Sequence, residues 1–183
     1  MIAGIVLKDE PREDCGVAFL DEELETYSVE SNEEMIELLD EHKPEVVAVN
    51  ASDKTSIKEF SKKEEELREE GHIFTPLSHE SELVKRFEAL KAGCQQSLGP
   101  DMPEFIRFEP SITAEELAIH NDDGLSSFGL ETGDIHSSEE FDAVLGAVTA
   151  RFYQQDQFDN FGIIVPNNLN PEESGEEDET QKA

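Results

Sequence analysis

Short apolar runs alternate with polar turns along the first half of the chain and predict β-strands. Residues 2–7 and 45–49 are almost continuously apolar, which is typical of strands buried on both faces of a sheet. Residues 24–29 alternate, with Leu24, Thr26 and Ser28 on one face and Glu25, Tyr27 and Val29 on the other, which suits an edge strand. The expected strands lie near residues 2–7, 16–21, 24–29, 45–50 and 105–109.

Apolar residues at helical spacing, preceded by capping signals, predict the helices. Ser31, Thr113 and Ser137 are each followed three residues later by Glu, which is the capping-box pattern. The expected helices begin after Ser31, cover 56–70 and 81–95, begin again after Thr113, and run over 138–153. The helix over 56–70 carries a thin apolar edge and is expected to lie exposed. A polar loop over 121–136 and a short last strand over 162–165 complete the pattern.

The order of these elements predicts an α/β domain. Three antiparallel strands come first and helix-linked strands follow, which makes a mixed five-stranded sheet with helices on both faces. We expect one domain over residues 1–166. Residues 167–183 are rich in Asn, Pro, Glu and Gly and are expected to form an acidic disordered tail.

Acidic residues dominate the charge of the chain. Asp and Glu number 45 against 14 Lys and Arg, for a formal net charge of −31, and they are spread along the whole length. In molar salt the Debye length falls to about 3 Å, so the self-repulsion of such a surface is largely screened. The composition therefore predicts a halophilic protein, and it offers no basic groove for nucleic acid.

Localisation follows from what the sequence lacks. It has no basic leader followed by a long apolar run, and no stretch of the roughly 20 apolar residues that a membrane span needs. Cys15 and Cys94 are far apart and are expected to be buried thiols. We expect a cytoplasmic protein that does not bind membranes.

Four stretches resemble a family within the ribonuclease H-like fold. They are Gly-Ile-Val-Leu at 4–7, Val-Val-Ala-Val-Asn-Ala-Ser at 46–52, Phe-Glu-Pro-Ser at 108–111, and Phe-Asp-Ala-Val-Leu-Gly-Ala-Val-Thr-Ala at 141–150 with Gly-Ile-Ile-Val-Pro at 162–166. On these residues the chain resembles the domain-of-unknown-function family 429, whose members are described as predicted nucleases. The chain looks like an acidic, haloarchaeal-type member of that family.

The resemblance implies a metal-dependent site that is only half present here. Nucleases of this fold hold two divalent cations with carboxylates from different strands. Where the family has acids on its first and fourth strands, this sequence has Val6, at the missing acid, and Asn50, whose amide can coordinate a metal only weakly as the third member of a degenerate site. The matching acids that remain are Glu109 and Asp142, which the resemblance makes the ligands for a weakly held Mg²⁺ or Mn²⁺.

Other interpretations of these residues stay open. Asp142 lies near a helix N-terminus, where a carboxylate is favourable without any metal. Glu109 precedes a proline at a strand end and could be an ordinary surface residue. Asp9, Glu10 or Asp53 could supply a substitute ligand from a loop.

The hypothesis that we prefer is a degenerate, catalytically silent member of the fold that acts as a binding or regulatory module. The alternative is a metal-dependent nuclease or phosphodiesterase that uses the remaining carboxylates. A charge mimic of nucleic acid is disfavoured, because mimicry needs a patterned patch and the acids are uniformly spread. The sequence identifies no partner, and nucleic acid enters by resemblance only.

Overall fold

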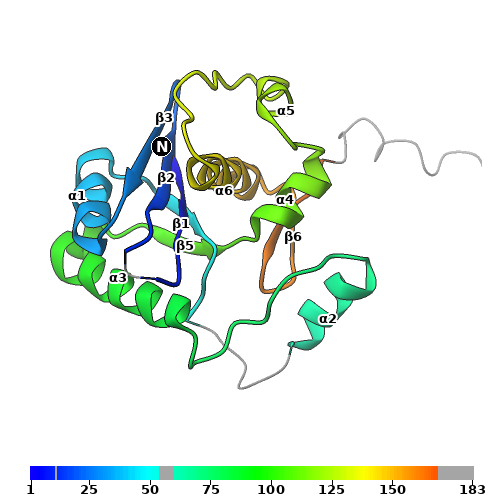
Figure 1. The fold of residues 1–183 in the computed structure, drawn as a ribbon, viewed down its shortest axis with the longest axis horizontal. Coiled ribbons are helices and arrows are strands. Elements are labelled where there is room, and N and C mark those ends of the chain that lie inside the picture. The colour runs from blue at the N-terminus through cyan, green and yellow to red at the C-terminus, as the bar shows by residue number, and fades with distance from the viewer. Residues whose placement is uncertain (11, 54–59, 169–183) are drawn as a thin grey trace, which may run out of the picture.

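A computed structural model describes residues 1–10, 12–53 and 60–168 of the chain. Its main sheet has five strands in the order β3-β2-β1-β4-β5 (Figure 1). The strands are β1 (Ile2–Val6), β2 (Cys15–Leu20), β3 (Leu24–Val29), β4 (Val46–Val49) and β5 (Glu104–Arg107). β2 pairs antiparallel with both β1 and β3, whereas β1, β4 and β5 run parallel. The predicted mixed α/β sheet is therefore confirmed.

Helices cover both faces of this sheet (Figure 1). The helices are α1 (Asn32–His42), α2 (Lys62–Glu69), α3 (Glu82–Leu98), the 3-10 turn Gly99–Asp101, α4 (Pro110–Leu117), α5 (Asp122–Ser126) and α6 (Ser138–Gln154). A hairpin of β6 (Phe158–Asn160) and β7 (Ile164–Pro166) forms a separate two-stranded sheet. Among the described helices, none is long and apolar enough to cross a membrane.

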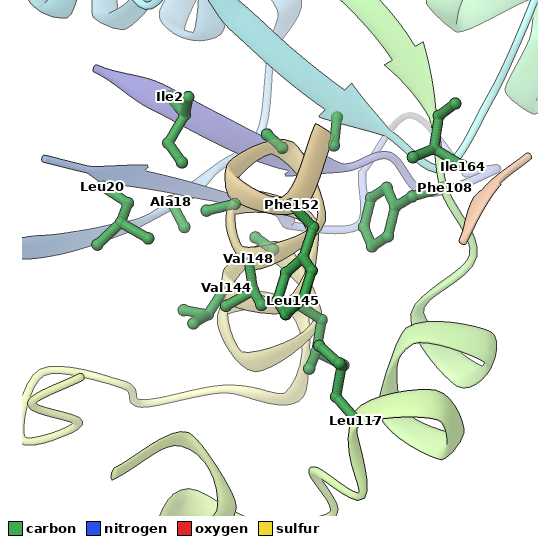
Figure 2. Packing of buried hydrophobic residues seen from close by; sticks show 14 of the residues in the cluster. Ile2, Ala18, Leu20, Phe108, Leu117, Val144, Leu145, Val148, Phe152 and Ile164 are labelled. Carbon is green, nitrogen blue, oxygen red and sulfur yellow. The ribbon is translucent and has the colours of Figure 1, made fainter. Parts of the chain in front are cut away.

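The strand period of two sends alternate side chains to two separate cores. Ile2 and Val6 of β1 belong to the core that includes α6, while Ile5 belongs to the core that includes α1 and α3. Figure 2 shows the α6 side, where Val144 and Val148 of the helix lie among side chains from the sheet and from α4. Because both faces of β1 are covered, its continuous apolar run is accounted for.

Glycine permits α6 to lie directly on the sheet. A Cβ on Gly4 would overlap the carbonyl oxygen of Ala143, and a Cβ on Gly16 would overlap that of Glu139. Gly146 of the helix lies against both the Gly4 backbone and the Phe108 ring. This close approach fixes the position of α6 along β1, and with it the position of the candidate site.

Two of the three predicted helix starts are confirmed and one is wrong. The Ser31 and Ser137 hydroxyls accept hydrogen bonds from the backbone of Glu34 and Glu140. Thr113 does not cap a helix, because α4 already begins at Pro110 with Glu109 as its N-cap. Proline is well suited to the first helical position, since its missing N–H would have no helical partner there.

The Thr113 side chain has a different role inside α4. Its hydroxyl lies 2.8 Å from that of Thr149 on α6, and both threonines are fully buried. This hydrogen bond therefore links α4 to α6 within the core.

The structure supports the description of one polar region and corrects another. The described part of the helix expected over 56–70 begins after Ser61 and is exposed at most positions, as expected, with Leu67 of its thin apolar edge fully buried. The stretch 121–136 contains α5 and buries Leu125 and Leu130, so it is not only a polar loop. Residues 54–59 and most of the expected acidic tail lie outside the described residues.

Candidate functional site

The candidate site lies where the end of β1 and the segment after β5 meet the first turns of α6. Gly4 lies beneath Ala143, and Gly16, the β2 partner of Val6, lies beneath Glu139. Val6 is therefore placed under the start of α6. Its side chain is 4% exposed and belongs to the apolar core together with Phe108.

Glu109 and Asp142 are brought together, as the sequence predicted. Both line an open pocket of about 450 Å³, together with Ser111, His120 and Phe141. Glu109 is the N-cap of α4, two residues beyond the end of β5. Asp142 is the fifth residue of α6 and so lies just past its first turn.

Burial perturbs both of these carboxylates. Desolvation raises the pKa of Glu109 to about 7; the Arg107 guanidinium opposes this rise and the Glu64 carboxylate adds to it. Arg107 Nη2 lies 3.9 Å from Glu109 Oε1, which is too far for a hydrogen bond. Desolvation also raises the pKa of Asp142, with a lowering influence from Lys8 and a raising one from Glu139. Neither charge is fully compensated by the surrounding protein.

The predicted third member of the site, Asn50, has a different role. Its Oδ1 accepts a hydrogen bond from the Leu7 N–H at 2.8 Å, and its Nδ2 donates to the Leu7 carbonyl at 3.0 Å. The side chain therefore prolongs the pairing of β1 with β4 past the end of both strands. Asn50 does not line the pocket of Glu109 and Asp142.

A lysine that the sequence interpretation missed lies beside the acids. Lys8 Nζ forms an ion pair with Glu139 Oε1 at 3.0 Å, and both side chains are partly exposed. The hydrogen bond to Glu139 raises the pKa of Lys8, and the Asp142 charge raises it further. The same hydrogen bond is the main cause of the lowered pKa of Glu139. An ammonium group thus supplies positive charge to the acids on the first turns of α6.

Two sequence spacings agree with this placement, although they do not identify the pair. Glu139 and Asp142 are three residues apart on a helix and so share a face. Lys8 follows Val6 by two residues, which directs it to the same side of the sheet as Val6 when the strand direction continues.

The alternative ligands do not converge on the pocket. Asp9 and Glu10 are exposed, and Asp53 forms a 2.7 Å ion pair with Lys91 of α3. Within residues 1–10, 12–53 and 60–168, no three His, Cys, Asp or Glu side chains are grouped so that they could hold a metal ion. A pair of Mg²⁺ or Mn²⁺ ions needs several shared oxygen ligands, and these residues do not fit that requirement.

Comparison with known proteins identifies the architecture. No protein-family model matches the chain, and no curated protein matches it. Among solved structures, Thermus thermophilus RuvC in complex with a Holliday junction substrate superimposes with a TM-score of 0.53 and 16% identity, covering 90% of this chain and 98% of RuvC. A second structure of Thermus thermophilus RuvC gives a TM-score of 0.52, 15% identity and the same coverage.

The fold is ribonuclease H-like. At this level of identity the similarity establishes the arrangement of the sheet and helices. The proposed membership of family 429 remains a prediction.

Proposed function

We propose that this protein is a catalytically silent ribonuclease H-like module that acts by binding, as a regulatory or scaffolding component in a high-salt cytoplasm. The observation that carries the proposal is the arrangement under the start of α6. Val6 places an apolar side chain at the end of β1, the central strand of the sheet, and the Lys8 ammonium pairs with Glu139 next to Asp142.

Electrostatics explain why this arrangement disfavours catalysis through metals. A divalent cation is held by carboxylates whose negative charge outweighs the cost of desolvation. Here one nearby positive charge is already provided by Lys8, and an ion would have to compete with it for Glu139 and Asp142. The site also lacks an acid on β1 that could bridge two ions, because the strand reads Ile-Ala-Gly-Ile-Val and ends at Val6.

The net charge bears on the nature of the partner. The first RuvC structure contains a Holliday junction, so branched DNA is a natural ligand to test on this chain. A chain with 45 acidic and 14 basic residues repels the phosphate backbone, even though molar salt weakens that repulsion. We therefore favour a partner other than nucleic acid.

A metal-dependent nuclease or phosphodiesterase is the second candidate. It is favoured by the pocket that contains both Glu109 and Asp142, and by the pKa of Glu109 of about 7. A carboxylate with a pKa near neutrality can exchange protons with a substrate at physiological pH.

Titration calorimetry with Mn²⁺ in about 2 M KCl, a salt concentration at which charges are strongly screened, separates the two candidates. We expect the native chain to bind Mn²⁺ weakly or not at all. The double variant Val6→Asp, Lys8→Met adds a carboxylate and removes the competing ammonium, so it should bind Mn²⁺ at least about tenfold more tightly. Val6→Asn, Lys8→Met is the matched control, because Asn has the size of Asp without its charge.

Nuclease assays on single-stranded, duplex and junction DNA and on RNA complete the test. The proposal predicts no cleavage by the native chain with Mg²⁺ or Mn²⁺. Tight Mn²⁺ binding by the native chain, together with cleavage that Asp142→Asn abolishes, would replace the silent module by the enzyme. Equal Mn²⁺ binding by the Asp and Asn variants would show that Val6 does not occupy the position that we assign to it.

A further inference from the structure

Helix α2 and the turn that follows it form a peripheral arm over residues 61–72. Figure 1 shows α2 at the edge of the molecule, away from the five-stranded sheet. The Ser61 and Glu64 side chains make a capping box at its start, and the His72 N–H donates to the Leu67 carbonyl at its end. The arm is therefore a well-formed local unit, and its attachment to the rest of the protein depends on side chains.

The first attachment is a buried ion pair. Glu64 Oε1 accepts a hydrogen bond from Arg107 Nη1 at 2.9 Å, with Glu64 6% and Arg107 8% exposed. Burial opposes ionisation of Glu64, but hydrogen bonds from Ser61 and Arg107 outweigh it and lower the pKa of this carboxyl. The pair connects the start of the arm to the end of β5.

The second attachment is a small apolar cluster. Leu67 is fully buried against Ile112 of α4 and Ile163 and Val165 around β7. This cluster is separate from the two cores that hold the sheet and its helices. Leu67 is thus the one apolar residue that α2 buries.

The third attachment is a histidine between two carboxylates. His72 is 7% exposed, its Nδ1 lies 3.0 Å from Glu115 Oε2, and its Nε2 lies 3.0 Å from Glu116 Oε1. A neutral imidazole carries one N–H donor, so it can satisfy only one ionised carboxylate. Both contacts are hydrogen bonds only when the ring carries two protons, or when one carboxyl is protonated. Glu115 and Glu116 of α4 are the charged groups that face the ring in the described structure.

We propose that the arm over residues 61–72 is a proton-dependent cover, which His72 holds closed on α4 at low pH and releases as the pH rises. Loss of the proton turns one of the two histidine–carboxylate contacts from attractive to repulsive, because two lone pairs then face each other. Within the described residues, the other contacts of the helix are the Glu64–Arg107 ion pair, buried Leu67 and a 3.5 Å hydrogen bond from Lys63 Nζ to the Asn160 carbonyl, which are few for a helix of eight residues.

The released arm would uncover a specific group. Among the described residues, Arg107 Nε and Nη2 are buried without a hydrogen-bond partner, while Nη1 is bonded to Glu64. Nε–H and the adjacent Nη2–H form one edge of the planar guanidinium, which is the edge that can hold a carboxylate or phosphate with two parallel bonds. When the arm moves away and takes Glu64 with it, the Arg107 guanidinium would become accessible to ligands.

Hydrogen exchange in about 2 M KCl, where long-range charge effects are screened, tests the proposal on the full chain. Protection factors, which are corrected for the intrinsic effect of pH on exchange, are compared at about pH 5.5 and pH 8.5, a range that spans histidine ionisation. We expect residues 62–72 to lose about tenfold in protection at the higher pH, which corresponds to one charge-assisted hydrogen bond. Residues 138–154 of α6 serve as the internal reference and should not change.

Glu115→Gln is the decisive variant. A neutral His72 can donate to Glu116 and accept from the amide introduced at position 115, so both contacts survive at high pH and the pH effect on the arm should disappear. Glu88→Gln, at an exposed position on α3, is the matched control and should retain the effect. An equal loss of protection in α6, no loss in the native arm, or an unchanged loss in Glu115→Gln would each overturn the proposal.

Discussion

The buried carboxyl of Glu109 should make the protein less stable at neutral pH than at acidic pH, and Glu109→Gln should remove that part of the pH dependence. The pKa of this group rises from 4.5 to about 7 because burial disfavours its charged form. Below about pH 4.5 the carboxyl is protonated in both the folded and the unfolded chain, so folding carries no free-energy cost of burying a charge there. Above about pH 7 it is ionised in both, and the folded state bears the full cost of desolvation.

The magnitude follows from the change in pKa. A rise from 4.5 to about 7 corresponds to about 3 kcal/mol, since each unit of pKa is worth about 1.4 kcal/mol. The side chain is 18% exposed, so little of this is lost to solvent screening. We expect Glu109→Gln to match the native chain at about pH 4.5 and to exceed its free energy of unfolding by up to about 3 kcal/mol at about pH 8.

Denaturant unfolding of both forms across this pH range, at constant KCl, measures the difference directly. Taking the difference between the two forms cancels the titration of the other acids, and Glu88→Gln controls for the loss of one charge. A variant less stable than the native chain at about pH 8 would refute the reasoning. That outcome would mean that Arg107 or a bound cation compensates the carboxylate, and only compensation by a cation would favour the metal-dependent enzyme.

Three further predictions concern the fold and its solvent. Gly4→Ala should lower the free energy of unfolding by about 3 kcal/mol or more, because its methyl group meets the α6 backbone, whereas Gly133→Ala, at an open position, should have little effect. Asn50→Asp should cost about 1–3 kcal/mol near neutral pH, because it loses the bond to the Leu7 carbonyl and places a carboxylate against it; urea unfolding measures this. The melting temperature should rise between about 0.1 and 3 M KCl, and a flat profile would contradict the halophilic interpretation of a net charge of −31.

Local sequence patterns were sufficient to predict most strands of the sheet and two of the helix starts. The apolar run at β1 and the capping serines at residues 31 and 137 are short-range signals, and the structure places those elements within one or two residues of the predicted bounds. Thr113 failed as a helix start because the proline at 110 offers a better first helical residue three positions earlier. The hairpin of β6 and β7 was only half predicted, since Phe158–Asn160 is short and mostly polar.

The candidate site was predictable only in part. Glu109 and Asp142 were identified because both lie at element ends that a parallel sheet brings together, and they do share a pocket. The structure places Asn50 outside this pocket, and its pairing with Leu7 could not be predicted because it depends on the register of β1 with β4. Lys8 escaped notice because its partner Glu139 lies at the start of the last long helix, far away in the sequence.

The sequence by itself determined the order of strands and helices, the two-sided burial of β1 and the extreme acidity of the surface, because each is set by periodicity, caps or composition. The tertiary structure decided which polar groups compensate one another. The sequence does not show that Lys8 meets Glu139, that Asn50 meets the backbone of Leu7, or that His72 lies between two glutamates. Those contacts depend on the depth at which α6 settles over Gly4 and on how α2 folds back onto α4, and such long-range packing leaves no local trace in the chain.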